Sequence, residues 1–163
     1  MARSIITGSF DPVTSGHENL IRRASPLFEE VTVVILANTE KKSGLFDPAD
    51  RLAMVQACIY ASGLTNIKAI LYGGLTSDAA HELGADYIIR GARNATDFDY
   101  EYNLSLIMKR FDPAFETIIL PTDPTLSMIS STYVRDLLKY GCELGDAVPE
   151  ACREMMRELY NNR

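Results

Sequence analysis

The stretch that says most about the fold lies between a short β-branched run and a helical pattern, and it reads Thr7-Gly8-Ser9-Phe10-Asp11-Pro12-Val13-Thr14-Ser15-Gly16-His17. Its glycines allow the backbone to approach a ligand closely, and the Ser9 hydroxyl can donate to a phosphate. His17 falls in the first turn of the following helix, where N–H groups and the helix dipole favour anions. The stretch therefore predicts a strand, a loop and a helix that hold a phosphate between Ser9 and His17. The alternative is a plain turn at Asp11-Pro12 with His17 on the surface.

The pattern is neither GxxxxGK[ST] nor GxGxxG, which argues against a P-loop or a dinucleotide-binding loop. Around it, five short apolar runs bounded by turn residues read as buried strands, at 4–7, 31–37, 67–71, 87–89 and 117–120. Helical patterns lie between them, including those from 47 and from 77 and those at 97–111, 130–140 and 149–160. Alternation of strand and helix predicts a parallel sheet with ligands at the carboxyl ends of the strands. We expect one α/β domain over residues 1–163, a doubly wound parallel sheet.

The composition of the chain excludes several classes of partner and of metal site. The 163 residues carry 16 Lys and Arg against 22 Asp and Glu, a net charge of −6, which argues against a nucleic-acid partner. The chain shows no signal peptide and no apolar run long enough for a membrane span, so no membrane partner is expected. Three widely spaced cysteines suit free thiols and a cytoplasmic location, and two histidines cannot form a multi-histidine metal centre.

A second informative block joins a short strand to a helix and reads Ile89-Arg90-Gly91-Ala92-Arg93-Asn94-Ala95-Thr96-Asp97-Phe98-Asp99-Tyr100-Glu101. Two arginines beside a glycine suit planar, bidentate contacts to phosphate. In the alternative interpretation the arginines are solvated and matched by Asp97, Asp99 and Glu101. The position at the end of a strand favours a ligand.

A third block begins a helix with three consecutive hydroxyl groups and reads Ser127-Met128-Ile129-Ser130-Ser131-Thr132-Tyr133-Val134-Arg135. One hydroxyl is enough for a helix cap, so three beside free N–H groups predict a cradle for a polyphosphate. Lys41-Lys42 follows the second predicted strand. That pair is either a solvated loop or a further contact to an anion at the same edge of the sheet.

These blocks resemble known enzymes. Thr14-Ser15-Gly16-His17 is similar to the T/HxGH motif of the nucleotidyltransferase superfamily, whose histidine contacts nucleotide phosphates. The RGxRxxxDFxYE stretch from Arg90 to Glu101, with the GSFDP opening and the ISST block, resembles the bacterial phosphopantetheine adenylyltransferase family. The resemblance covers essentially the whole chain. It implies a Rossmann-like nucleotidyltransferase fold and transfer of the adenylyl group of ATP to 4′-phosphopantetheine, giving dephospho-CoA and pyrophosphate.

The resemblance also implies site residues. It assigns His17 and Lys41 to catalysis, and Ser9, Lys41, Thr76 and Arg90 to phosphopantetheine. The residues that it assigns to ATP are Ser9, Phe10, His17, Gly91, Ala92, Arg93, Glu101, Leu126, Ser127, Met128, Ile129, Ser130, Ser131 and Thr132. It further implies a homohexamer. Since the sequence shows no acidic metal cluster, we expect Mg²⁺ to be held largely by phosphates and water, and we expect feedback by coenzyme A because it shares the pantetheine arm with the substrate.

Some positions depart from the family pattern as we know it. Thr7 stands where proline often precedes the glycine, Met108 where asparagine is often found, and Thr76 where a larger apolar residue is common. The last two put the contacts to the pantetheine arm in question, and the choice between Lys41 and Lys42 is open. Two alternatives remain: a nucleotidyltransferase with another phosphate acceptor, such as a mononucleotide, and a nucleotide-binding module without turnover.

Overall fold

The computed structural model describes residues 2–37 and 44–163, and it confirms the predicted parallel α/β architecture. All neighbouring strands run parallel, in the order β3-β2-β1-β4-β5. The strands are β1 (Arg3–Gly8), β2 (Glu30–Leu36), β3 (Ile67–Tyr72), β4 (Tyr87–Ala92) and β5 (Glu116–Pro121). The order steps outward from β1 in both directions, so the switch point lies between β1 and β4, where ligands of such sheets bind.

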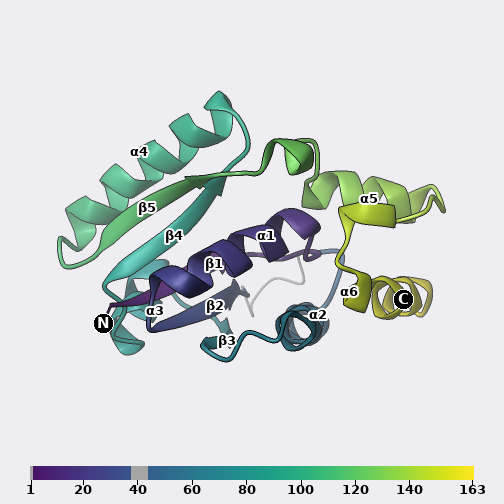
Figure 1. Cartoon of the computed structure of the whole chain (residues 1–163), viewed down its shortest axis with the longest axis horizontal. Coiled ribbons are helices and arrows are strands. Elements are labelled where there is room, and N and C mark those ends of the chain that lie inside the picture. Colours follow the sequence, from purple (N-terminus) through teal and green to yellow (C-terminus); the bar gives the residue numbers. More distant parts are fainter. Residues whose placement is uncertain (1, 38–43) are drawn as a thin grey trace.

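The α-helices cover both faces of this sheet (Figure 1). They are α1 (Ser15–Ala24), α2 (Pro48–Ser62), α3 (Thr76–Glu82), α4 (Ala95–Phe111), α5 (Ser131–Lys139) and α6 (Glu150–Asn161). Short 3₁₀ turns lie at Ser25–Leu27, Pro124–Leu126 and Gly145–Ala147. No helix in the described part of the chain is long and apolar enough to cross a membrane.

Alternation along the strands explains the two apolar layers. Ile6 and Ile89 join α1, α2, α5 and α6 in the larger core, whereas Ile5 and Ile88, their neighbours along the chain, face the smaller core under α3. Successive side chains of a strand point to opposite faces, so a continuous apolar run marks a strand that is covered on both sides. The doubly wound arrangement is confirmed.

Two element boundaries differ from the prediction in ways that affect the site. Strand β4 runs on past 89 to Ala92, because Arg90, Gly91 and Ala92 pair with the end of β5. Arg90 is therefore held on a strand rather than on a loop. Helix α4 begins at Ala95 rather than at 97, since Asn94 caps it by accepting a hydrogen bond from the Asp97 N–H at 2.9 Å.

Candidate functional site

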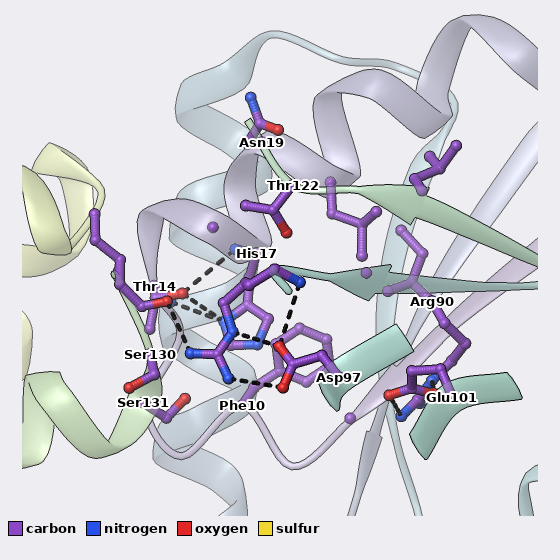
Figure 2. Close-up of a pocket in the computed structure, with 18 of the residues that line it drawn as sticks. Phe10, Thr14, His17, Asn19, Arg90, Asp97, Glu101, Thr122, Ser130 and Ser131 are labelled. Carbon is purple, nitrogen blue, oxygen red and sulfur yellow. Dashed lines mark hydrogen bonds and ion pairs between the residues drawn. The ribbon is translucent and has the colours of Figure 1, made fainter. Parts of the chain in front are cut away.

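A cavity of about 500 Å³ opens at the carboxyl ends of β1, β4 and β5, beside the N-termini of α1 and α5. We call it the first cavity. Figure 2 shows Thr14, His17, Asp97 and Ser130 gathered in one part of it, with Arg90 and Glu101 in another. The predicted residues that line it are Ser9, Phe10, His17, Arg90, Gly91, Arg93, Glu101, Ile129, Ser130, Ser131 and Thr132.

Other predicted residues lie away from this cavity. Ala92 is buried in the sheet, and Met128 projects outward with 84% of its surface exposed. Ser127 turns its hydroxyl to the Pro124 carbonyl, and Leu126 packs against the larger core. Lys41 and Lys42 fall outside the described residues. The three blocks of the sequence therefore do meet, although not every residue of each block faces the hollow.

The start of α1 fixes the orientation and the protonation of His17. The Thr14 N–H donates to His17 Nδ1 at 3.0 Å, and the Thr14 hydroxyl caps the helix by accepting from the His17 N–H. Because a backbone N–H can only donate, Nδ1 carries no proton, and the neutral ring has its proton on Nε2. Burial, helped by the charges of Arg93 and Arg90, lowers the pKa of His17 to about 4. At neutral pH this imidazole is an uncharged donor.

The loop between β1 and α1 is anchored by buried charged groups. Phe10 is fully buried in an unusual backbone conformation with φ of 47°, and its ring lies 4.8 Å from the His17 ring, centre to centre. The Asp11 carboxylate accepts from the N–H groups of Leu45 and Phe46 at 2.7 and 2.9 Å. Arg51, buried in α2, donates to the Ser9 carbonyl at 2.9 Å. These contacts hold Ser9 at the mouth of the cavity.

Arg90 is clamped from two sides. Its Nε and Nη2 donate to the Glu101 carboxylate at 2.6 and 2.8 Å, and its Nη1 donates to the carbonyl and the hydroxyl of Thr7, both at 2.7 Å. The side chains of Arg90 and Glu101 are 19% and 10% exposed. The pairing that the alternative interpretation expected thus exists for this arginine, but it lies in the wall of the cavity rather than in solvent.

Arg93 follows a similar pattern closer to solvent. Its Nε donates to Asp97 at 2.8 Å, and its Nη1 reaches the Ile129 carbonyl at 3.4 Å. Through these contacts Arg93 joins the start of α4 to the loop before α5. It stays about one third exposed on the cavity side, so part of its charge can still meet an anion.

Each hydroxyl at the start of α5 has a protein partner. Ser130 caps the helix through the Tyr133 N–H, Ser131 donates to the Pro12 carbonyl at 2.8 Å, and Thr132 accepts from Arg135 at 2.8 Å. Arg135 also donates to the Asp11 carbonyl. These contacts divide the work within the predicted cradle of hydroxyls and N–H groups. The hydroxyls build its shape. The cap takes the Tyr133 N–H, and the N–H groups that a helix start leaves without a partner inside the helix are the better anion donors.

A second cavity of about 600 Å³ lies on the other side of Arg90. Its wall combines Thr76 at the start of α3 with the apolar side chains of Leu75, Leu104, Met108 and Phe111. Thr7 and Arg90 line both cavities, so they form the partition between them. A hollow with polar and apolar lining in similar measure and a mostly apolar one thus meet at an arginine.

Comparison with known proteins decides the family. The cytidylyltransferase-like family model matches residues 5–137. Phosphopantetheine adenylyltransferase from Leptospira biflexa is 40% identical over 158 residues, 97% of each chain, and that from Desulforudis audaxviator is 37% identical over 163 residues, 100% of this chain and 98% of the relative. The chain belongs to the phosphopantetheine adenylyltransferase family. A crystal structure of a candidate nicotinate-nucleotide adenylyltransferase from Vibrio parahaemolyticus covers the whole chain and 98% of its own, with a TM-score of 0.74 at 19% identity, and supports the fold alone.

Sequence reasoning missed several residues that line the first cavity. Asn19, Arg23 and Thr122 line the first cavity, and Arg23 donates to the Pro121 carbonyl at 2.6 Å. Asn19 and Arg23 are four residues apart and share one face of α1, which is the signal that could have revealed them. The structural roles of Asp11 and Arg51 had no local signal, because their partners lie more than 30 positions away.

Proposed function

We propose that this chain transfers the adenylyl group of ATP to 4′-phosphopantetheine, giving dephospho-CoA and pyrophosphate in coenzyme A biosynthesis. The observation that carries the proposal is the pair of cavities that meet at Arg90, one rich in N–H donors and one mostly apolar. Such a pair suits a reaction of two substrates in which a phosphate group of one must meet a phosphate group of the other. Relatives of this name that align over nearly the full chain support it.

In this proposal ATP occupies the first cavity. Helix N-termini are built to bind phosphate, and two of them, those of α1 and α5, open onto this hollow. Arg93 and the first turn of α5 hold the β- and γ-phosphates, which leave as pyrophosphate. The remaining contacts to ATP come from Ser9, Phe10, His17, Gly91, Glu101 and residues 129–132, all of which line the cavity.

Phosphopantetheine occupies the second cavity, with its phosphate at the partition. Arg90 and Ser9 bind the phosphate there, and Thr76 lies along the arm. Met108 supplies apolar surface that suits the methyl and methylene groups of the arm, but no amide group for its peptide-like bonds. Lys41 is the proposed lysine contact to this substrate, and Lys42 is the alternative.

The chemistry needs no protein nucleophile. A phosphate oxygen of phosphopantetheine attacks the α-phosphorus of ATP, and the bond to the β-phosphate oxygen breaks as pyrophosphate leaves. The protein therefore acts by placement and by stabilising charge in the transition state. His17 donates its Nε2 proton as a hydrogen bond to an α-phosphate oxygen, and because the ring is neutral it acts as a fixed dipole. Lys41 adds a positive charge, and Ser9 bridges the two substrates.

In the proposed reaction, Mg²⁺ would bind together with ATP rather than at a site made of protein side chains. Within residues 2–37 and 44–163, no group of three or more His, Cys, Asp or Glu side chains could hold a metal ion. The acidic groups of the first cavity, Asp97 and Glu101, are engaged by arginines. The phosphates of ATP and water would therefore carry the ion, which would supply positive charge beside the departing pyrophosphate.

We also propose a cytoplasmic homohexamer with feedback by coenzyme A. Along α4 many large apolar side chains are about half exposed or more, among them Phe98, Tyr102, Leu106, Ile107 and Phe111. A row of this kind on one helix is typical of a surface covered by another subunit. Coenzyme A shares the pantetheine arm with the substrate and would compete for the second cavity.

A single assay tests the reaction. Pyrophosphate release from MgATP is measured with 4′-phosphopantetheine, nicotinamide mononucleotide, FMN and no acceptor. Release with phosphopantetheine alone is the expected result. Release with a mononucleotide instead would assign a different acceptor, and no release with any acceptor would indicate a nucleotide-binding module.

A further inference from the structure

Thr7 carries a hydroxyl group at a position where packing alone does not require one. It lies in the centre of the sheet near the end of β1, is 6% exposed and is paired with Val34 of β2. Valine has nearly the same shape and a high strand propensity, so it would fill this place equally well. The hydroxyl is thus the feature of Thr7 that calls for an explanation.

That hydroxyl accepts a hydrogen bond from Arg90 Nη1 at 2.7 Å, and the Thr7 carbonyl accepts a second from the same nitrogen at 2.7 Å. A guanidinium has five N–H groups in one plane. Thr7 engages Nη1, and Glu101 engages Nε and Nη2. Four hydrogen bonds are therefore made, and one Nη2 N–H has no acceptor among the described residues.

Arg90 lines both cavities, so its unused N–H lies at the partition where the two substrates meet. The direction of this N–H depends on the plane of the guanidinium. Glu101 alone, bound along one edge, would leave the group free to swing with the carboxylate. Contacts at the opposite edge, from the Thr7 hydroxyl and carbonyl, fix the plane.

We propose that Thr7 is a positioning residue for phosphopantetheine: its hydroxyl fixes the guanidinium plane of Arg90 so that the remaining N–H meets the acceptor phosphate. The inference rests on the proposed function and deepens it. It predicts a defect mainly in the use of phosphopantetheine. Thr7 and Arg90 also line the first cavity, but the β- and γ-phosphates of ATP are assigned to Arg93 and the start of α5, whose hydrogen bonds do not involve Thr7.

The test compares three variants in the pyrophosphate-release assay. Thr7→Val removes the hydroxyl and keeps the shape, and it should raise KM for 4′-phosphopantetheine roughly three- to tenfold. This is less than the full loss of a hydrogen bond to a charged group, because the Thr7 carbonyl still accepts from Arg90 Nη1. KM for ATP should stay within about twofold. Thr7→Ser restores the hydroxyl and should restore KM. Ser4→Ala is the matched control, because Ser4 is a buried hydroxyl on the same strand that makes no hydrogen bond.

Three results would overturn the inference. One is an unchanged KM for phosphopantetheine in Thr7→Val, and another is a KM in Thr7→Ser as high as in Thr7→Val. The third is an equal rise of both KM values, which would indicate a general structural defect. If Thr7→Val does not fold, Thr7→Ala is measured with the same expectations. Wild-type protein that releases no pyrophosphate with phosphopantetheine would refute the proposed function as well, whereas the other results leave it intact.

Discussion

Replacing His17 in two different ways separates its role in folding from its role in the reaction. Nδ1 of His17 accepts from the Thr14 N–H. The proton on Nε2 is the group that we propose donates to the α-phosphate of ATP. His17→Asn keeps an acceptor at about the position of Nδ1 and removes the donor. His17→Ala removes both groups.

The structure sets the size of each effect. Loss of one donor to a charge that develops in the transition state costs about 10²- to 10³-fold in kcat, and we expect a loss of at least about 10²-fold from both variants. Loss of the reciprocal cap at the start of α1 costs about 1 kcal/mol, which lowers Tm by roughly 2–4 °C in a chain of this size. His17→Ala should show this loss of stability, and His17→Asn should show little of it.

The measurements are kcat from pyrophosphate release with saturating ATP and phosphopantetheine, and Tm from thermal unfolding of the same preparations. A kcat for His17→Asn near that of the wild type would refute the role of Nε2. An equal loss of Tm in both variants would refute the assignment of Nδ1 as the capping acceptor.

Three further predictions concern charged groups. The pKa of His17 is lowered to about 4, so an NMR titration should show its neutral Nε2–H form down to about pH 5. The unfolded chain takes up this proton near pH 6.5, so the free energy of unfolding should fall as the pH drops below 6.5. Titration of His17 near pH 6.5 in the folded protein would contradict the burial argument. Arg90→Ala should raise KM for phosphopantetheine about tenfold or more, and an unchanged KM would count against the assignment. Asp11→Ala removes one hydrogen bond to the buried Phe46 N–H and one to the partly buried Leu45 N–H, and it should lower the free energy of unfolding, measured in urea, by about 3 kcal/mol. Asp47→Ala, at a helix start without a side-chain cap, should cost about 0.5 kcal/mol or less, and equal losses would refute the anchoring role of Asp11.

Local patterns in the sequence were enough to predict the sheet and the meeting of the three blocks. Strands such as Val31–Leu36 are apolar on both faces, and that pattern requires helices on both sides of the sheet. Parallel strands end at one edge, so residues after β1, β4 and β5 had to approach one another. His17 and Ser130 could be placed near the cavity for this reason alone.

Long-range pairing could not be predicted in the same way. Nothing near Arg90 in the sequence indicates that Thr7, 83 positions earlier, holds one edge of its guanidinium. The capture of the Ser131 hydroxyl by the Pro12 carbonyl was equally hidden, because it depends on how α5 lies against the loop before α1. Sequence patterns identify the groups that are present, and the fold decides which of them remain free for a ligand.

The partition formed by Thr7 and Arg90 has a consequence for inhibitor design. Since one wall serves both cavities, a molecule that links a nucleotide to an apolar arm across that wall would fill both of them. Its second half would bind at a high effective concentration, so the affinity could exceed that of either half by about 10²- to 10⁴-fold if the linker matches the span. Under the proposed function, the joined product would span the same wall and would compete with both of its precursors.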